Sequence, residues 1–281
     1  MNTLGFLYKT KIGRTLLRPL VSKPVSDLSG VILDSPFSRI LIKPFAKRNG
    51  IRLSDYRMDG IKSFNDFFCR KIKPGLRPVD KDKDALVAPC DGLLSVCRIS
   101  SGSILSVKQS RFTVSRLLRD RKLAAAFNDG YALIYRLCVD NYHRYVYFDS
   151  GRKYRNRKIK GVYHTVRPVA LETYPVFIEN TREYAVIDTE NFGRCVQMEV
   201  GAMLVGKIVN KERKARIVRR GAEKGHFEYG GSTIIVLIPK GKAKLREDIM
   251  RCVNKNIEIP VKMGETIGSR ITSCESAKNT L

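Results

Sequence analysis

The N-terminal stretch of the chain carries apolar residues at helical spacing. Residues recur every four positions at Leu4, Tyr8, Ile12, Leu16 and Leu20, with basic residues interleaved at Lys9, Lys11, Arg14 and Arg18. Two interpretations fit this pattern. One is an amphipathic helix that lies in a bilayer interface, with its lysines and arginines toward the lipid headgroups. The other is an ordinary helix packed on the protein's own core, and the spacing alone leaves both open.

Helix signals continue through residues 1–60, which read as a basic helical region. Ser35 and Pro36 are typical of a helix start, and Gly50 suits its end. The segment "SFNDFFCR", residues 63–70, opens with a Ser-x-x-Asp capping pattern and predicts another short helix. The loop "KPGLRPVD", residues 73–80, is a candidate subdomain boundary.

From about Ala85 the pattern changes to short β-branched and apolar runs separated by glycine turns. The runs are "ALVAPCDGLLSVCRI", "GYALIYRLCV", "EYAVIDT", "GRCVQMEVGAMLVGKIV" and "STIIVLI", and one helical patch, "TVSRLLRDRKLAAAF", interrupts them. This alternation predicts an α+β protein, with the helical region 1–60 followed by a mostly β domain over residues 61–281. The basic segments 151–161 and 211–221 are expected to be solvated loops.

Charge changes the picture more than composition does. The chain of 281 residues has 53 Lys and Arg against 27 Asp and Glu, a net charge of +26, while its hydrophobic content of 43% is ordinary for a globular protein. Such a charge predicts attraction to polyanions, either nucleic acid or an anionic membrane surface.

The distribution of cysteine and histidine argues against a disulfide framework or a metal site. The cysteines are odd in number and scattered singly, at Cys69, Cys90, Cys97, Cys138, Cys195, Cys252 and Cys274. The histidines, His143, His164 and His226, have no metal-ligand spacing. We therefore expect a reducing compartment and no metal. We also expect neither a membrane span nor a signal peptide.

The segment "EKGHFEYGGSTIIVLIPKG", residues 223–241, places a serine between two glycines and an apolar strand. A turn before a buried strand is the ordinary explanation. The alternative is self-cleavage, in which the Ser232 hydroxyl attacks the carbonyl of Gly231, since glycine has no Cβ to block the approach. The amide becomes an ester, elimination frees the upstream chain, and hydrolysis leaves a pyruvoyl group at position 232.

Seven separated motifs resemble, in order, those of the phosphatidylserine decarboxylase family. They are "FNDFFCRKIKPGLRPVD", "APCDG", "NYHRY", "GVYHTVRP", "VGAMLVGKI", "EKGHFEYGGST" and "NKNIEIPVKMGETIG", and they span residues 64–268. The resemblance implies a carboxy-lyase that forms phosphatidylethanolamine and CO₂ from phosphatidylserine. It also implies cleavage between Gly231 and Ser232 into chains 1–231 and 232–281. The pyruvoyl group made from Ser232 would be the cofactor, acting as an electron sink.

The resemblance further assigns an aspartate, a histidine and the cleaved serine to one site. The aspartate is Asp91 in "APCDG", for which a simple Asp-Gly turn is the alternative. Many bacterial members carry two histidines three residues apart; here the first is His143 and the second position is Val146. We therefore expect His143 in the substrate pocket as a proton donor, and His164 as the base of self-cleavage, oriented by a carboxylate. The alternative for His164 is a hydrogen-bonded strand histidine.

Three functions follow from these observations. A decarboxylase bound peripherally to the cytoplasmic face of the cell membrane explains the charge and the N-terminal stretch, with phosphatidylserine and the anionic surface as partners. A homodimer is expected by resemblance. An uncleaved lipid-binding relative is the second possibility, because the second histidine is missing. A basic nucleic-acid-binding protein is the third, but no nucleic acid is expected as partner, because no RRM, zinc-finger or helix-turn-helix signature occurs.

Overall fold

The computed structural model describes residues 3–100, 104–107, 110–172, 174–202, 207–230, 232–255 and 257–271. Its α and 3₁₀ helices are α1 (Thr3–Lys9), α2 (Lys11–Leu20), α3 (Lys23–Asp34), η1 (Pro36–Leu41), α4 (Ile42–Arg48), η2 (Leu53–Asp55), α5 (Phe64–Phe68), α6 (Val114–Leu118), α7 (Arg121–Ala125), α8 (Pro168–Leu171), α9 (Val176–Glu179) and α10 (Glu247–Met250). Its strands are β1 (Tyr56–Arg57), β2 (Lys71–Ile72), β3 (Ala85–Val87), β4 (Gly92–Arg98), β5 (Ile104–Val107), β6 (Ser110–Thr113), β7 (Tyr131–Leu137), β8 (Arg144–Val146), β9 (Gly151–Lys153), β10 (Arg157–Ile159), β11 (Arg182–Thr189), β12 (Gly193–Gly201), β13 (Ile208–Asn210), β14 (Arg216–Val218), β15 (Glu223–Phe227), β16 (Ser232–Ile238), β17 (Ala243–Leu245), β18 (Ile259–Val261) and β19 (Thr266–Arg270).

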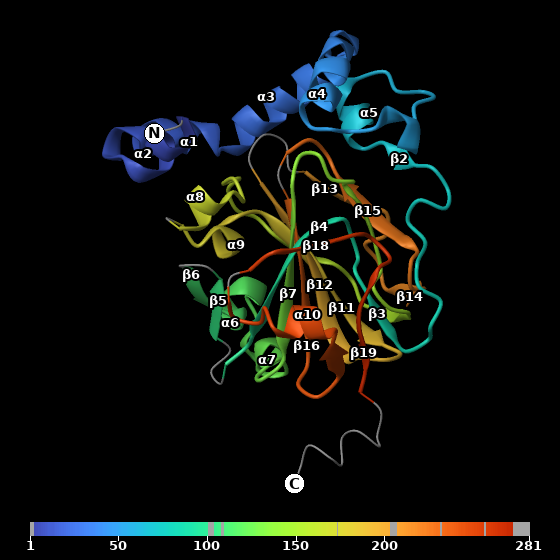
Figure 1. Ribbon diagram of the computed structural model, residues 1–281. Helices are drawn as coiled ribbons and strands as arrows, with labels where there is room; N and C mark the ends of the chain where they lie inside the picture. The colour runs from blue at the N-terminus through green and yellow to red at the C-terminus, as the bar shows by residue number, and fades with distance from the viewer. Residues whose placement is uncertain are drawn as a thin grey trace.

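A nine-stranded sheet organises the described part of the chain, and the prediction of a mostly β core in a mixed helix and sheet protein is confirmed (Figure 1). The strand order is β14-β9-β11-β12-β16-β7-β4-β18, with β10 also paired to β11. Smaller sheets, β13-β15-β8 and β17-β19-β3, flank it. Neighbouring strands of the large sheet are antiparallel.

Strand β16 lies near the middle of this sheet and is buried on both faces. Its alternate residues enter two different cores: Ile235 and Leu237 pack in one, and Ile234, Val236 and Ile238 pack in the other. Because successive side chains of a strand point to opposite faces, a strand covered on both sides needs a continuous apolar run. The unbroken apolar sequence at residues 234–238 is thereby explained.

The N-terminal stretch forms two helices, and part of its apolar pattern packs on the protein's own core, as the second interpretation predicts. Helix α1 ends before Thr10, whose hydroxyl accepts a hydrogen bond from the Gly13 amide and starts α2. Tyr8 and Leu17 are buried in the core of the protein. Ile12, in contrast, is 70% exposed. The break at Thr10 prevents the four-residue row from forming one continuous face. No described helix combines the length and hydropathy that crossing a membrane requires.

The other helix starts come largely where the sequence predicts them. Ser63 and Asp66 form a complete capping box at the start of α5. Pro36 begins the 3₁₀ helix η1, which α4 then continues, and the chain leaves α4 shortly before Gly50, at φ +64°. Helices α1 to α5 lie together at one end of the large sheet (Figure 1).

Two predictions about chain segments need correction. The basic segments 151–161 and 211–221 contain strands β9, β10 and β14 and are not simply loops. Their backbone groups pair at the edge of the large sheet while many of their charged side chains stay in solvent, so pairing does not depend on an apolar pattern there. The helical patch at residues 113–127 is divided into α6 and α7 by Arg119, which has φ +50°.

Candidate active site

Ser232 is the first residue of β16 and is held on both sides. Its backbone pairs with Gly201 at the end of β12 and with Leu137 at the end of β7. The side chain is fully buried, and its Oγ has no hydrogen-bond partner among the residues that the structure describes. A buried hydroxyl without a partner is uncommon in folded proteins and calls for a functional explanation.

The residues just before Ser232 enter the strand through a backbone shape that favours glycine. Gly230 has φ +139°, a region that residues with a Cβ rarely adopt. Gly231, which would contribute the scissile carbonyl, lies outside the described residues.

Asp91 immediately precedes β4 and lies at the same end of the strands as Ser232. At this end of the large sheet, β4 begins, β7 ends and β16 begins. A Cβ on Gly92 would lie 2.9 Å from the carbonyl oxygen of Arg136, so the glycine permits the close approach of β4 to β7. Two strand spacings separate the start of β4 from the start of β16, about 10 Å at the usual interval.

The carboxylate of Asp91 is buried and fully engaged. It accepts hydrogen bonds from Arg77 Nε at 2.7 Å and Nη2 at 2.6 Å, and from the Met263 amide at 2.9 Å. These bonds raise the pKa of the Arg77 guanidinium. A bidentate pair of this kind fixes both side chains in one geometry. Met263 belongs to the same buried apolar cluster as Tyr142, the residue before His143.

His143 is fully buried and has one free ring nitrogen. Its Nδ1 lies 3.0 Å from the carbonyl oxygen of Asn141, and its Nε2 has no hydrogen-bond partner within the described part of the chain. The ring packs on Phe68 of α5, with 4.1 Å between centroids. Burial, helped by the charge of Arg70, lowers the pKa of His143 to about 3. The imidazole is therefore neutral near pH 7, and Nε2 is available to accept a proton when Nδ1 carries the hydrogen.

His164 has a different environment, in which both ring nitrogens have partners. Nδ1 lies 3.3 Å from the Tyr8 hydroxyl, and Nε2 lies 3.4 Å from Glu179 Oε2. The ring stacks on Tyr174 at 4.6 Å. Burial lowers the pKa of His164 to about 4. These contacts are typical of a histidine with a structural role, which is the alternative interpretation of His164.

The two histidines lie on opposite faces of the large sheet. Strand alternation puts the side chain of Ser232 on the side of Ile234, whose core also contains Phe227. The Phe227 amide donates to the backbone carbonyl of His143, which places His143 on that side. Tyr8, the partner of His164, packs in the core on the opposite face. The described side chains of Asp91, His143 and Ser232 make no hydrogen bond with one another.

Comparison with known proteins agrees with this arrangement of motifs. The family model for phosphatidylserine decarboxylase matches residues 64–269. The chain belongs to the phosphatidylserine decarboxylase family. Phosphatidylserine decarboxylase proenzyme 2 of Clostridium acetobutylicum is 41% identical over 266 residues, 94% of this chain and 91% of the relative. The proenzymes of Ruminiclostridium cellulolyticum and Clostridium perfringens strain SM101 are 41% and 36% identical, over 95% of this chain and 91% and 92% of theirs.

The residues matched by the family model include all four that the sequence nominates: Asp91, His143, His164 and Ser232. The members named above are proenzymes of a carboxy-lyase. Within the described ranges, no group of three or more His, Cys, Asp or Glu side chains could hold a metal ion.

Two residues of this site were not predicted from the sequence. Arg77, which holds Asp91, lies inside a quoted motif and could have been nominated as the partner of a buried acid. Asn180 gave no local signal. Its side-chain amide donates to the carbonyl oxygens of His164 and Gly201, both at 2.8 Å, and so ties the His164 segment to the strand end that pairs with Ser232.

Proposed function

We propose that this chain is a phosphatidylserine decarboxylase that cleaves itself between Gly231 and Ser232 and forms phosphatidylethanolamine and CO₂. Family membership supports the reaction class and the processing of a precursor. The observation that carries the proposal for these residues is the buried, unpartnered hydroxyl of Ser232 directly after the glycine pair. An unpartnered Oγ is free to attack a neighbouring carbonyl, whereas a hydrogen-bonded one would first lose its partner.

Self-cleavage needs only the chain and water. Ser232 Oγ attacks the carbonyl carbon of Gly231, and the peptide nitrogen leaves as an amine, which converts the amide to an ester. Loss of the Cα proton of residue 232 expels the carboxylate of Gly231 and leaves a dehydroalanine. Its hydrolysis releases ammonia and leaves the pyruvoyl group. The pyruvoyl carbonyl then serves as the electron sink for decarboxylation.

His143 is the base that the contacts favour for this cleavage. It lies on the Ser232 side of the sheet with Nε2 free, while both nitrogens of His164 are occupied. A pKa of about 3 means that the imidazolium formed from His143 gives its proton up readily, which suits delivery to the leaving amine. After cleavage the same side chain stays on the face of the sheet that carries the side chain of residue 232, where Nε2 can take a proton from the substrate's ammonium group and return it to the α-carbon after CO₂ has left. Asp91 orders this edge through Arg77 and the Met263 amide.

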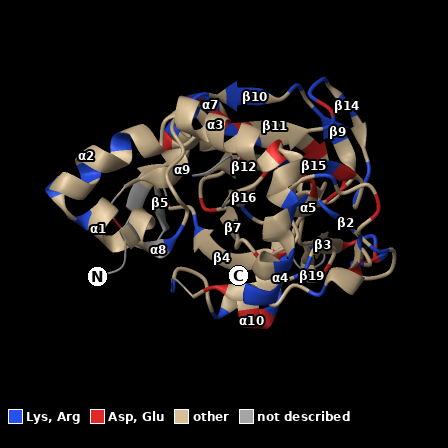
Figure 2. Cartoon of the chain, turned by 90° about the horizontal axis from the view of Figure 1, so that it is seen from above, with Lys and Arg blue, Asp and Glu red and all other residues tan. Residues whose placement is uncertain are grey.

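Helices α2, α3 and η1 are the part of the protein proposed to contact the membrane. We call the exposed large apolar residues of this region the apolar face: Ile12, Leu16, Leu20, Leu28, Val31, Ile32, Phe37, Ile40 and Leu41. Helix α2 carries Lys11, Arg14 and Arg18 and no acidic residue (Figure 2). Apolar side chains beside cations suit the interface of an anionic bilayer. The cytoplasmic leaflet, which is anionic, is the surface that a charge of +26 fits. A homodimer remains a prediction.

Intact mass spectrometry of the purified wild-type chain and of Ser232→Ala tests the proposal. The wild type should yield a small chain of about 6 kDa for residues 232–281, lighter by one ammonia than a chain starting with serine. Ser232→Ala should remain one chain and release no CO₂ from phosphatidylserine, and Asp91→Ala should behave nearly the same. A wild type that decarboxylates the lipid while residue 232 is still an amide-linked serine would refute the proposal.

A further inference from the structure

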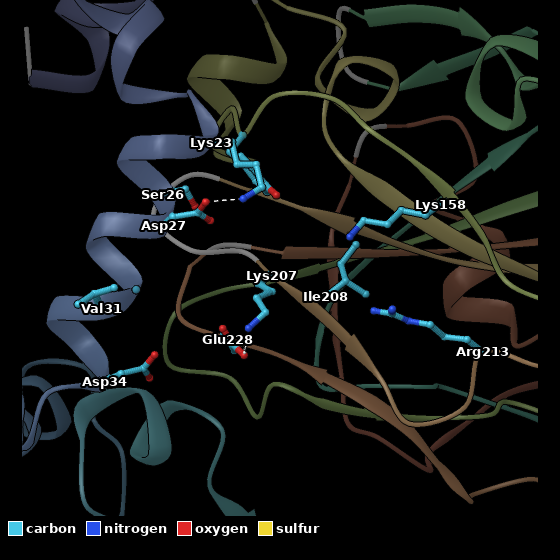
Figure 3. A pocket seen from close by; sticks show the side chains of 12 residues that line it. Lys23, Ser26, Asp27, Val31, Asp34, Lys158, Lys207, Ile208, Arg213 and Glu228 are labelled. Atoms are coloured by element: carbon cyan, nitrogen blue, oxygen red, sulfur yellow. Dashed lines mark hydrogen bonds and ion pairs between the residues drawn. The ribbon is translucent and has the colours of Figure 1, made fainter.

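A cleft of about 340 Å³ lies between α3 and the side of the molecule formed by β10, β13 and the segment after β13. Its volume is within the range of small-molecule sites. Figure 3 shows Lys158 and Arg213 reaching toward α3 from the opposite side, with Lys207 between them and the helix. These two side chains come from the basic segments 151–161 and 211–221, for which the proposed reaction supplies no role.

The two walls of the cleft differ in how their charges are satisfied. On α3, Asp27 pairs with Lys23, and Asp34 accepts a hydrogen bond from Asn65 at 2.9 Å. The acidic groups of the helix are therefore already engaged.

The cations opposite are less engaged. Lys207 pairs with Glu228 at 2.9 Å but is largely exposed. Among the described residues, the one ion pair of Arg213 is long, with 3.8 Å between its Nε and Glu183 Oε1, and Lys158 has no ion pair. Lys158 and Arg213 thus present cationic donors that an anion could satisfy.

The rim of the cleft belongs to the apolar face. Val31 lines the cleft and is 69% exposed, and Leu28 and Ile32 on the same helix are also exposed. A cleft in which two weakly engaged cations lie across from exposed aliphatic side chains matches a molecule with an anionic head and apolar chains. Nucleic acid has the anionic part of this chemistry and lacks the apolar part.

The cleft is also connected to the segment that leads into Ser232. Glu228 lines it and lies four residues before the serine. Asn65, which donates to Asp34, also accepts a hydrogen bond from the Tyr229 amide at 3.0 Å. A ligand held in the cleft would therefore lie against the segment that leads to Ser232.

We propose that Lys158 and Arg213 bind the phosphodiester of the anionic glycerophospholipid substrate in this cleft, while its acyl chains lie along the apolar face at Val31. This inference rests on the proposed function for the identity of the substrate. The two basic segments would then recognise the lipid phosphate. In the lipid headgroup, this phosphate is bonded directly to the serine that reacts.

Binding of short-chain lipids below their micelle concentration tests the proposal. The Ser232→Ala protein is titrated calorimetrically with dihexanoyl phosphatidylserine and with dihexanoyl phosphatidylglycerol. Adding Lys158→Gln and Arg213→Gln should weaken both lipids roughly tenfold, equivalent to about 1.4 kcal/mol. The matched control is Lys160→Gln with Arg219→Gln, which removes the same charge from the same two segments outside the cleft and should leave both affinities unchanged.

The outcomes separate this inference from the proposed function. Equal weakening of both lipids supports a phosphodiester site, whereas weakening of phosphatidylserine alone would overturn the phosphate assignment. Unchanged affinity, or a variant that loses only RNA oligonucleotide binding, overturns the cleft. In the wild-type Ser232 background, decarboxylation that is unaffected by the cleft substitutions would leave the function standing and the cleft refuted. Lipid binding by the Ser232→Ala protein without decarboxylation by the wild type would do the reverse.

Discussion

At the scale of single residues, the site combines a serine hydroxyl and an imidazole nitrogen that are both buried and both unpartnered. Leaving such groups unsatisfied costs stability, on the order of 1–3 kcal/mol each, and a fold retains that cost where the groups have another use. Ser232 and His143 lie on one side of the sheet. His164 is also buried, but its Nδ1 is hydrogen-bonded to Tyr8 and its Nε2 lies 3.4 Å from a carboxylate oxygen of Glu179. Burial alone therefore does not distinguish His143 from His164, whereas the partners of their ring nitrogens and the faces of the sheet on which they lie do differ.

Single substitutions of the histidines should separate their roles. We expect His143→Ala to slow self-cleavage by about 10²-fold or more, the usual contribution of a general base. His164→Ala should cleave at nearly the wild-type rate, although with reduced stability, because its contacts are structural. Cleavage is followed on a denaturing gel, with His226→Ala as the control. Blocked cleavage in His164→Ala together with normal cleavage in His143→Ala would reverse the assignment.

At the scale of elements, β15 delivers the chain to the cleavage segment, and a buried ion pair attaches it to the large sheet. The ammonium of Lys224 on β15 lies 2.5 Å from Glu199 on β12, and both side chains are fully buried. Asn210 on β13 donates to the same carboxylate at 3.1 Å. Burial raises the pKa of Glu199, and the lysine opposes that rise. The pair thus fixes how β15 lies against the strand that pairs with Ser232.

Replacing one partner of this ion pair should destabilise the protein more than replacing both partners. In the Ser232→Ala background, Lys224→Met leaves a buried carboxylate unpaired and should lower the free energy of unfolding by about 3–5 kcal/mol. The double variant Lys224→Met with Glu199→Met should recover most of that loss, since two apolar side chains replace two charges. Urea unfolding measures both. A double variant as unstable as the single one would show that the pair's charges are not what holds β15.

At the scale of the whole molecule, helices α1 to α5 lie over the end of the sheet that contains the site. Their inward side packs against residues of the site, and their outward side is exposed. Inward, Phe68 packs on His143, and Phe64 packs on Tyr229 at 5.1 Å. Outward, the apolar face is exposed, with Phe37 at 89% and Ile40 at 78%. Large apolar side chains this exposed, gathered in one region, indicate an interaction surface. The proposed membrane contact would therefore bring the lipid to the end of the molecule that contains Ser232.

Removing apolar side chains from η1 should weaken membrane binding without unfolding the protein. We expect Phe37→Ser with Ile40→Ser to reduce sedimentation with phosphatidylglycerol vesicles by at least tenfold in affinity, because each buried apolar side chain contributes about 1.5–3 kcal/mol. Decarboxylation of dihexanoyl phosphatidylserine in solution should be unchanged, because neither Phe37 nor Ile40 lines the cleft where Val31 lies. Ile217→Ser serves as control, since Ile217 on β14 is 69% exposed and lies outside the apolar face. Vesicle binding that is unaffected by the double substitution would contradict the proposed orientation.

The sequence by itself determined the features that depend on residues close together in the chain. The capping box at Ser63, the doubly buried run after Ser232 and the order of the family motifs are of this kind, because helix ends and strand periodicity follow from local spacing. The site of cleavage was predicted on the same basis and stays a prediction. Only the tertiary structure decided that Arg77 holds Asp91 and that His143, not His164, shares the face of Ser232. Those relations depend on which strands pair across long stretches of chain, and no local pattern encodes that pairing.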